Sequence, residues 1–368
     1  MKILFYLTLF FDILYGGLLL SYFLKWRNHN RTTISKWKDE TIWPTVSIII
    51  PVRNEEKNIP ALVNDLASLD YPSDKLEIIF VDDHSDDNTL QLLAFKKHFS
   101  LSNTFGKKAA LDFGIRQSNS EWIVTIDVDI HFKSNWLKQL IHPSINSNAN
   151  MICGLVQIKF YNNKWWSKFQ SMEFANLQAA GSAALLQSRM LLNSGANLAF
   201  KKDAWLKVGA YNSHNHLASG DDTFLMFEIN KLFPGTVFPA FDAIVSTSPE
   251  KNFHDLLKQR LRWSSKTIHY KEPYVWFVGI LITTSAMLTT LLWITSCLLV
   301  PTVIIFPIVI LVTRAIPEWL LLDESLKESG VKFSIFDKVL MSIIYPFFVI
   351  TLLLIQPFSK NTWKGRQL

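Results

Sequence analysis

Residues 46–50 read VSIII, residues 76–83 read LEIIFVDD, and residues 122–129 read WIVTIDVD. Each is a short, mostly apolar run, which is typical of a strand buried on both faces of a sheet. We expect helices between them, one opened by Asn54 and Glu55 and running to about Leu69, and another from about Asp87. This alternation predicts an α/β fold in which helices cover a mostly parallel sheet. The predicted domain spans residues 45–272.

Two strongly apolar regions flank this domain. Residues 3–24 are long enough to cross a membrane as a helix, and no small-residue cleavage pattern follows them as it would in a signal peptide. The second region, residues 275–322, is too long for one crossing, and we expect a break at Pro301 or Pro307. The sequence predicts one N-terminal membrane helix in residues 1–26 and about three in residues 273–368, near 275–299, 301–322 and 339–358.

The distribution of charge suggests how the chain is oriented. Five basic residues lie between positions 25 and 38, mostly in the linker at 27–44, which predicts a cytosolic domain on a multi-pass protein of the inner (cell) membrane. Four full crossings would put the basic C-terminal tail outside, so a re-entrant segment near Pro301 is an alternative. The net charge of +6 fits an anionic membrane or phosphorylated ligands. No basic stripe of the kind that nucleic acid requires is present in the sequence.

Acidic residues end two of the expected strands. Asp127 and Asp129 are two positions apart, so in an extended segment their side chains point the same way. Such a pair suits Mg²⁺ or Mn²⁺, which can also hold a diphosphate, although a strand end can simply expose two solvated acids. Asp83 follows another strand at the edge where ligands bind such sheets, and its carboxylate could accept hydrogen bonds from a nucleobase or a ribose.

Further candidates lie at expected helix starts. Lys107 could reach a phosphate or remain a solvated lysine. Asp221 and Asp222 could be acids stabilised by the helix dipole, or one of them could act as a general base. Ser85 and Asp87 are typical of a turn and a helix cap.

Four other features have open interpretations. Residues 259–263 read QRLRW, which suits a membrane-surface anchor or a site where Arg262 binds phosphate and Trp263 stacks on a sugar. Asp12 is either a functional intramembrane acid or a contact between helices. The amphipathic stretch from Trp165 to about Met190 is either a membrane-face helix that guides a lipid-linked acceptor or a core helix. We interpret His214 and His216 as loop residues.

The order of these motifs resembles family 2 glycosyltransferases, a large inverting family with a GT-A fold that includes cellulose and hyaluronan synthases. The likeness covers roughly residues 45–263. It is carried by residues 47–56 (SIIIPVRNEE), 81–89, 106–111, 127–129, 193–211 and 220–222, and by Gln259, Arg262 and Trp263, which match the Gln-x-x-Arg-Trp motif of membrane-embedded members.

The resemblance implies a UDP- or GDP-sugar donor, a divalent cation (Mg²⁺ or Mn²⁺) and a lipid or glycan acceptor. It implies metal binding by Asp129 with Asp127, and catalytic roles for the base Asp222 and for Gln259, Arg262 and Trp263. The implied acceptor residues are Asn197, Asp221 and Trp263. The implied nucleotide-sugar site consists of Pro51, Arg53, Glu55, Asp83, Lys107 and Asp127.

The sequence also departs from the family pattern. The usual strand between Thr89 and Gly106 is weak or missing, and the base motif reads Gly-Asp-Asp instead of Gly-Glu-Asp, which favours Asp222 as the base. The membrane part is smaller than in polymer synthases. The leading hypothesis is therefore transfer of one sugar to a lipid or lipid-linked acceptor, with a processive polysaccharide synthase as the alternative. A small transporter and a nucleotide-sugar sensor rank lower.

Overall fold

The structure is a computed structural model that describes residues 1–29, 42–145, 147–160, 164–209, 221–298, 304–359, 362–363 and 366–367. The chain forms two compact units. We call them the sheet unit (Asn30–Lys159 and Leu192–Ser248) and the membrane-helix unit (Met1–His29, Phe160–Leu191 and Pro249–Leu368). The domain expected at 45–272 is thus divided, because residues 160–191 and 249–272 group with the membrane helices.

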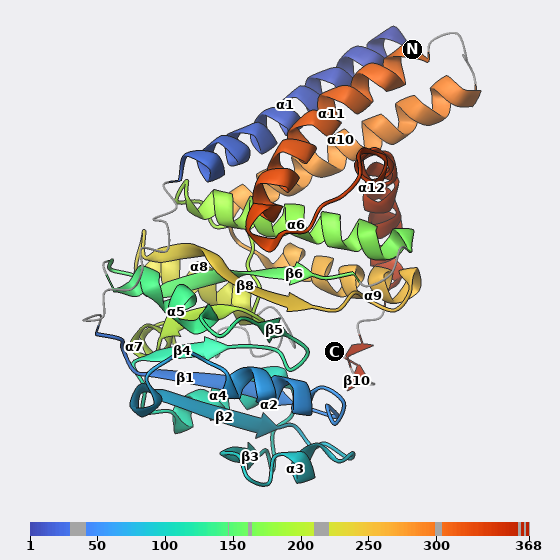
Figure 1. The fold of residues 1–368 in the computed structure, drawn as a ribbon. Coiled ribbons are helices and arrows are strands. Elements are labelled where there is room, and N and C mark those ends of the chain that lie inside the picture. The colour runs from blue at the N-terminus through green and yellow to red at the C-terminus, as the bar shows by residue number, and fades with distance from the viewer. Residues whose placement is uncertain are drawn as a thin grey trace. The chain divides into compact units, whose positions relative to one another are not determined.

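The sheet unit is built on an eight-stranded sheet in the order β3-β2-β1-β4-β7-β6-β8-β5 (Figure 1). Strands β3, β2, β1 and β4 are mutually parallel, and β6 is parallel to β8. Strand β7 runs antiparallel to both of its neighbours, and β5 runs antiparallel to β8. The mostly parallel sheet is therefore confirmed. The strands are β1 Val46–Val52, β2 Leu76–Asp82, β3 His98–Ser100, β4 Trp122–Thr125, β5 His131–Phe132, β6 Met151–Ile158, β7 Leu198–Lys201 and β8 Val237–Thr247.

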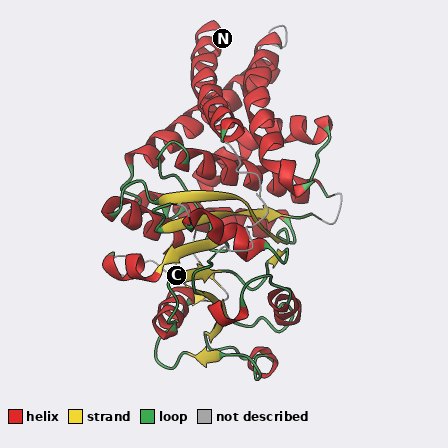
Figure 2. Ribbon diagram, turned by 60° about the vertical axis from the view of Figure 1, so that its left-hand side comes forward, coloured by secondary structure: helices red, strands yellow, loops and turns green. Residues whose placement is uncertain are grey.

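Burial explains why the three quoted apolar runs form adjacent strands. Ile48, Ile49 and Ile50 are successive residues of β1 with no solvent exposure, so both faces of this strand are covered. Helix α4 packs so closely that a Cβ at Gly114 would lie 2.6 Å from Cγ2 of Ile49. The end of β2 is buried in the same way, and Figure 2 shows the strands with helices beside them.

Two helices of the sheet unit differ from the prediction. The helix expected from Asn54 begins only at Ile59, because Asn54 has a φ of 54°, which an α-helix cannot contain. The helix expected near Asp87 is a four-residue turn, and the strand expected to be weak or missing is present as the short β3. The helices of this unit are α2 Ile59–Ala67, α3 Thr89–Leu92, α4 Lys107–Gln117, α5 Trp136–Ile141, α7 Lys202–Lys207 and α8 Asp221–Leu232.

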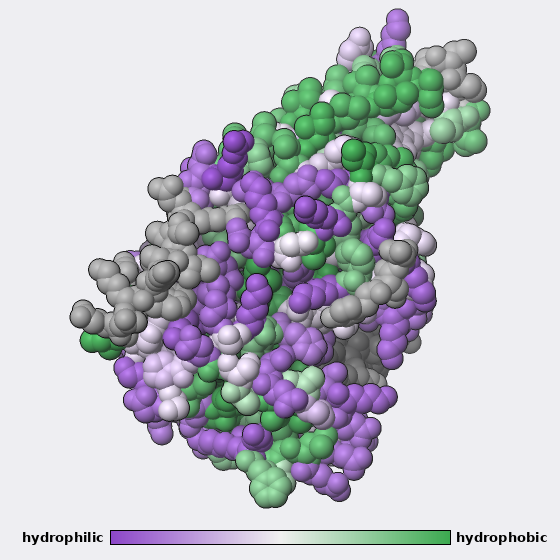
Figure 3. Space-filling model, viewed as in Figure 1, coloured by the Kyte–Doolittle hydropathy of each residue, from purple (hydrophilic) through white to green (hydrophobic). Residues whose placement is uncertain are grey.

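The membrane-helix unit contains four helices that are long and apolar enough to span a membrane. They are α1 Lys2–Asn28, α10 Pro273–Leu298, α11 Ile305–Leu326 and α12 Ile335–Ile355. Hydrophobic side chains cover their visible faces (Figure 3). The predicted arrangement of one N-terminal and three C-terminal helices is confirmed. The same unit holds α6 Trp165–Leu185 and α9 Phe253–Ser264, and the C-terminal residues include β9 Thr362–Trp363 and β10 Arg366–Gln367.

The helix boundaries correct two expectations. Pro307 does not break the second apolar region, because it lies in the first turn of α11, where a missing N–H costs no helical hydrogen bond. The alternative break, Pro301, lies outside the described residues. Helix α12 begins four residues earlier than expected, because Ser334 and Asp337 form a capping box at its start.

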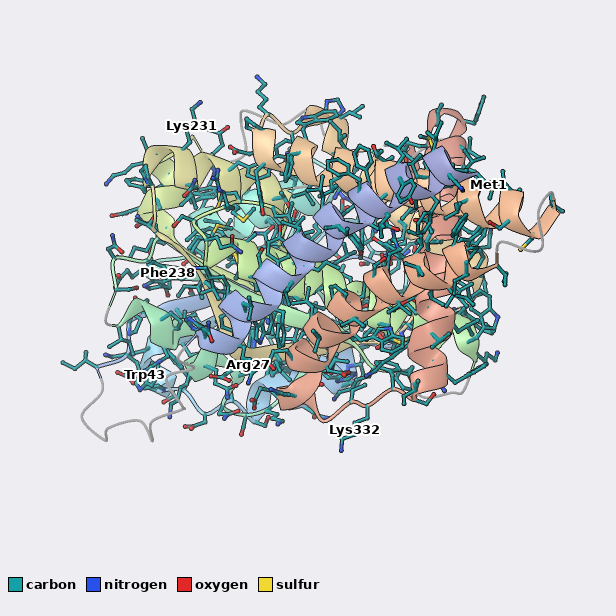
Figure 4. All side chains as sticks on the ribbon, turned by 90° about the horizontal axis from the view of Figure 1, so that it is seen from above. Met1, Arg27, Trp43, Lys231, Phe238 and Lys332 are labelled. Atoms are coloured by element: carbon teal, nitrogen blue, oxygen red, sulfur yellow. The ribbon has the colours of Figure 1, made fainter. Side chains whose placement is uncertain are left out.

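A buried ionic cluster connects the four membrane helices. Asp12 of α1 lies 3.0 Å from Nη1 of Arg314 of α11, and both side chains are fully buried. Thr289 of α10 donates to Asp12 at 3.1 Å, and Ser342 of α12 donates to Glu318 of α11 at 2.8 Å. The structure thus supports the reading of Asp12 as a contact between helices. Figure 4 labels Met1 and Arg27 at the two ends of α1.

Helix α6 is largely buried within the membrane-helix unit. Phe169 and Met172 pack with residues of α9, α11 and α12, among them Leu256, Leu322 and Phe348. Buried positions run consecutively from Phe169 to Ala175, which is not the one-sided pattern expected of an amphipathic surface helix. The structure therefore favours the core-helix interpretation of this stretch.

Candidate functional site

The carboxyl ends of neighbouring strands meet at one edge of the sheet. Because β1 is parallel to β2 and to β4, residues that follow these strands lie at the same edge. Asp83 follows β2 and donates its backbone N–H to the carbonyl of Val52 at 2.9 Å. Asp127 and Asp129 follow β4. The edge therefore collects acids from two distant stretches of chain.

Asp83 is the buried acid of this edge, with 1% of its surface exposed. Its Oδ2 lies 3.8 Å from Nη1 of Arg53, and its Oδ1 lies 3.2 Å from Nδ1 of His84. A buried carboxylate needs such partners, because an uncompensated buried charge is costly. Arg53 comes from the turn after β1, so the contact joins two strand ends. Pro51 lies opposite Val81 within the β1–β2 pair.

Side chains in the turn after β2 hold the turn after β1. Ser85 accepts the backbone N–H of Asn54 at 2.9 Å, and Asp87 accepts that of Glu56 at 3.1 Å. Asp87 also accepts the N–H of Thr89, at the start of α3, at 2.9 Å. These bonds support the predicted turn role of Ser85 and Asp87, whereas the N-cap residue of α3 is Asn88, whose side chain makes no capping hydrogen bond.

Asp127 and Asp129 have different partners. Nζ of Lys107, the first residue of α4, lies 2.5 Å from Oδ1 of Asp127. Thr247, the last residue of β8, donates its hydroxyl to Asp129 at 2.8 Å. The surrounding protein removes water from part of Asp129, and the Asp127 charge repels it. Together they raise the pKa of Asp129, and Glu55 acts in the same direction.

These side chains fit a divalent cation. Desolvation, and after it the charge of the neighbouring Asp127, raises the pKa of Asp129, and a bound cation would offset both effects. Carboxylate oxygens are the ligands that Mg²⁺ and Mn²⁺ prefer. Among the described residues, no group of three or more His, Cys, Asp or Glu side chains could hold a metal ion. Water or substrate oxygens would therefore have to complete the coordination by Asp127 and Asp129.

Asp222 is held at the same edge. Its Oδ2 accepts the N–H of Gly195 at 2.8 Å, and its Oδ1 accepts the N–H of Thr223 at 2.7 Å. A Cβ at Gly195 would lie 3.3 Å from Cβ of Asp222, so the contact depends on the small size of glycine. The carbonyl of Gly195 accepts the hydroxyl of Thr125, the last residue of β4, at 3.0 Å. Asp222 is thus tied to the strand that leads to Asp127.

Asn193 fixes the start of α8 behind Asp222. Its side-chain amide donates to the Asp222 carbonyl at 3.3 Å and to Sγ of Cys153 at 3.7 Å, and it accepts from the Thr223 hydroxyl at 3.1 Å. Burial raises the pKa of the Cys153 thiol to about 12, so the sulfur is a neutral acceptor. Asn193 belongs to the segment 193–211 that carries the family resemblance, but neither it nor Thr247 was predicted as a site residue, because no local pattern indicates their distant partners.

Asn197 has a structural role. It is fully buried, and its Nδ2 donates to the carbonyls of Leu155 at 2.8 Å and Ala243 at 2.7 Å. Its Oδ1 accepts the indole N–H of Trp136 at 3.0 Å. Since both of its N–H groups are used within the protein, the structure gives no support to an acceptor-binding role for Asn197.

Some candidates lie beyond what the structure describes. His214, His216 and Gly220 are outside the described residues, and so is the side chain of Asp221. The roles of these positions remain predictions.

Gln259, Arg262 and Trp263 lie on α9, in the membrane-helix unit. Gln259 donates to Glu250 at 2.6 Å, and Arg262 and Trp263 are half-buried. The side chain of Gln259 is therefore engaged within its own unit.

The buried arginine of this motif is Arg260, which was not among the residues predicted from the sequence. It is 4% exposed, and its Nη2 lies 2.6 Å from Oε2 of Glu173 on α6. Its guanidinium lies 4.3 Å from the ring centroid of Trp263, a cation–π contact. Arg260 lies on the buried face of α9 together with Leu256 and Leu261. The spacing of Arg260 from the apolar Leu256 could have indicated that it is buried.

Comparison with known proteins gives these features a family context. Residues 47–209 match the model of glycosyl transferase family 2. The chain is 28% identical over 229 residues to glycosyltransferase AglE of Haloferax volcanii, which covers 60% of this chain and 71% of that protein. It is 32% identical over 106 residues to the undecaprenyl-phosphate 4-deoxy-4-formamido-L-arabinose transferase of Yersinia pseudotuberculosis, which covers 26% of this chain and 32% of that protein.

A solved structure shares the fold. The mannosyltransferase PcManGT from Pyrobaculum calidifontis, in complex with GDP-Man and Mn²⁺, aligns with a TM-score of 0.60 and 16% sequence identity. The alignment covers 96% of this chain and 99% of that chain. The GT-A fold expected from the sequence is confirmed.

Proposed function

We infer the function from one premise: residues 47–209 match the model of glycosyl transferase family 2. We propose that the chain is a membrane-bound, inverting, metal-dependent glycosyltransferase. It moves a sugar from a UDP- or GDP-sugar to a hydroxyl of a lipid or lipid-linked acceptor. The observation that carries this proposal is the meeting of Asp83, Asp127, Asp129 and Asp222 at one sheet edge.

The donor would lie along this edge. Asp83 would accept hydrogen bonds from the nucleoside, near Pro51, Arg53 and Glu55. Asp129 and Asp127 would hold Mg²⁺ or Mn²⁺, which when bound neutralises charge on the leaving diphosphate. Lys107 would turn from Asp127 toward the diphosphate, because it lies at a helix start that favours anions.

Asp222 would act as the general base. It accepts the proton of the acceptor hydroxyl while that oxygen bonds to the anomeric carbon from the face opposite the diphosphate. As this bond forms, the bond between the anomeric carbon and the diphosphate oxygen breaks, the nucleoside diphosphate leaves with the bonding electron pair, and the configuration of the carbon inverts. The N–H groups of Gly195 and Thr223 orient the carboxylate for this step.

The acceptor would bind beside the donor. We assign Asp221 and Trp263 to acceptor contacts and Arg262 to the diphosphate. Gln259 belongs to the same Gln-x-x-Arg-Trp motif as Arg262 and Trp263. The four apolar helices support a lipid or lipid-linked acceptor, and the basic residues after α1 support a cytosolic domain on the inner membrane.

A processive polysaccharide synthase is the second candidate, favoured by the Gln-x-x-Arg-Trp spacing of Gln259, Arg262 and Trp263 on α9. Product length after incubation with labelled donor and lipid extract separates the two. A single added sugar supports the leading proposal, and a ladder of longer products supports the alternative.

The test of the proposed chemistry is Asp222→Asn in the full-length protein. After a screen of UDP- and GDP-sugars with and without Mn²⁺ identifies the donor, transfer should fall on the order of a hundred-fold or more, while the donor Kd stays unchanged. The matched control is Asp203→Asn, the same change in the first turn of α7, where the side chain is exposed. Turnover near that of the unmodified protein in Asp222→Asn would contradict the assignment.

A further inference from the structure

Arg260 is a buried cation that joins two helices of the membrane-helix unit. Its Nη2 lies 2.6 Å from Oε2 of Glu173 on α6, and its Nε donates to both oxygens of that carboxylate at 3.1 Å. The two side chains are only 4% and 5% exposed. A buried ion pair adds little net stability over an apolar pair of the same size, because both charges lose their hydration. The other contacts of Arg260 indicate what the pair does.

Arg260 also holds the side chain of Gln259. Nη1 of Arg260 donates to Oε1 of Gln259, and Nε2 of Gln259 donates to Oε1 of Glu250 at 2.6 Å. Glu250 is tied to α6, because Gln170 accepts its backbone N–H at 3.0 Å and donates to its carbonyl at 3.3 Å. Both ends of the Gln259 amide are therefore engaged, which fixes the orientation of this side chain.

The indole of Trp263 lies against the same guanidinium. The guanidinium carbon of Arg260 is 4.3 Å from the ring centroid of Trp263 and 5.5 Å from that of Phe174 on α6. The rings of Phe174 and Trp263 have centroids 5.5 Å apart. Arg260 and Trp263 are three residues apart on α9, so they share one side of the helix. Because Trp263 is half-buried, these contacts hold the indole while part of it stays exposed to solvent.

We propose that Arg260 is a positioning residue, which holds Trp263 and Gln259 in the orientation that acceptor binding requires. This inference rests on the proposed function, in which Trp263 contacts the acceptor. Arg260 is buried, so it acts through these two side chains and not by touching the substrate. A guanidinium suits this role, because its rigid fork of donors reaches Glu173 and Gln259 together while its flat face packs on an aromatic ring.

The test removes both charges of the pair in the full-length protein, as Arg260→Met combined with Glu173→Met. Neither charge is then left buried without its partner, so this variant should unfold at nearly the temperature of the unmodified protein. Transfer is measured with the labelled donor found in the screen of UDP- and GDP-sugars, while lipid extract is titrated as the acceptor. The KM for lipid extract should rise about ten-fold, because the cation–π contact that orients Trp263 is lost, and the donor KM should stay unchanged.

Arg260→Lys separates the charge of the side chain from its shape. Lysine keeps a cation beside Glu173, so the unfolding temperature should change little. It lacks the planar fork, so the KM for lipid extract should still rise. A purely structural ion pair predicts instead a KM equal to that of the unmodified protein whenever the fold is kept.

The matched control is the same double change at another ion pair of α6, as Lys168→Met combined with Asp337→Met. Asp337 also takes part in the capping box of α12, so this control should lower the unfolding temperature. Both KM values should stay unchanged, because this pair contacts neither Gln259 nor Trp263.

The outcomes distinguish this inference from the proposed function. A KM for lipid extract equal to that of the unmodified protein in both Arg260 variants would overturn the positioning role alone. An equal rise in the donor KM would also overturn it, because a general distortion of the enzyme would then be the cause. An unmodified protein that transfers no sugar from any UDP- or GDP-sugar to lipid extract would overturn the proposed function and this inference together.

Discussion

Oppositely charged side chains cluster in two places, at the sheet edge and among the membrane helices. The two clusters differ in how far their side chains are exposed to solvent. In the membrane-helix unit, Asp12 and Arg314 have no exposure, and hydroxyl groups of Thr289 and Ser342 complete the cluster. At the sheet edge, the side chains of Lys107 and Asp127 are 25% and 38% exposed, and Asp129 is exposed, with a pKa raised by partial desolvation and by its acidic neighbour.

This difference separates a structural cluster from a candidate ligand site. The membrane cluster is closed to solvent and uses its polar groups to join helices. At the sheet edge Asp127 is partly exposed, and its charge acts on the neighbouring Asp129 carboxylate. Acidic residues alone therefore do not mark a site, whereas accessible acids that repel one another do.

The comparison predicts opposite phenotypes for one chemical change at two positions. Asp129→Asn should reduce metal-dependent transfer on the order of a hundred-fold or more and leave the unfolding temperature nearly unchanged, because it removes a repelled carboxylate. Asp12→Asn should lower the free energy of unfolding by about 3 kcal/mol, because Arg314 loses one of its two buried carboxylate partners and keeps Glu318, and should leave the nucleotide Kd unchanged in the folded fraction.

The measurements are transfer rates with titrated Mn²⁺ and thermal unfolding in detergent. If Asp12→Asn instead abolished transfer in a fully folded protein, or if Asp129→Asn unfolded the chain, the distinction between the two regions would fail.

Within the sheet edge, Gly195→Ala should lower kcat about ten-fold with little change in donor KM. The new methyl group would press on Asp222 and displace the base, and an ångström-scale displacement reduces rates on this order. Thr125→Val removes the hydroxyl that holds Gly195, so it should act in the same direction, and Thr125→Ser should restore most of the rate. A change in KM without a change in kcat would argue against positioning of the base.

Within the membrane helices, Gly16→Ala should cost about 1–3 kcal/mol of stability, the smallest effect that we predict. A Cβ at Gly16 would lie 3.2 Å from both Cγ of Pro317 and the carbonyl oxygen of Thr313 on α11. Gly17→Ala is the control, because a Cβ there would meet nothing within 4 Å. Equal unfolding temperatures for the two variants would show that α1 and α11 tolerate a wider separation.

The sequence predicted the features that local patterns determine. The buried runs at β1, β2 and β4 and the long apolar helices are continuous stretches, so their composition alone indicates them. The acids after β2 and β4 were predicted to share an edge because parallel strands align their carboxyl ends.

Features that depend on distant contacts were missed. Asp12 was visible as an intramembrane acid, but its partner Arg314 lies about 300 residues away and has no pattern linking the two. The reversed direction of β7 and the burial of Arg260 against Glu173 likewise arise from tertiary packing. The later start of α2 follows from the left-handed Asn54, which its residue type permits but does not require.

The contact between Lys168 of α6 and Asp337 of α12 has a consequence for biosynthesis. The two side chains meet at 2.9 Å, although 169 residues separate them along the chain. The sheet unit has all its residues once Ser248 is made, whereas α6 can form this contact only after α12 has been made. The sheet unit can therefore begin to fold during synthesis while the packing of α6 against α12 is still incomplete.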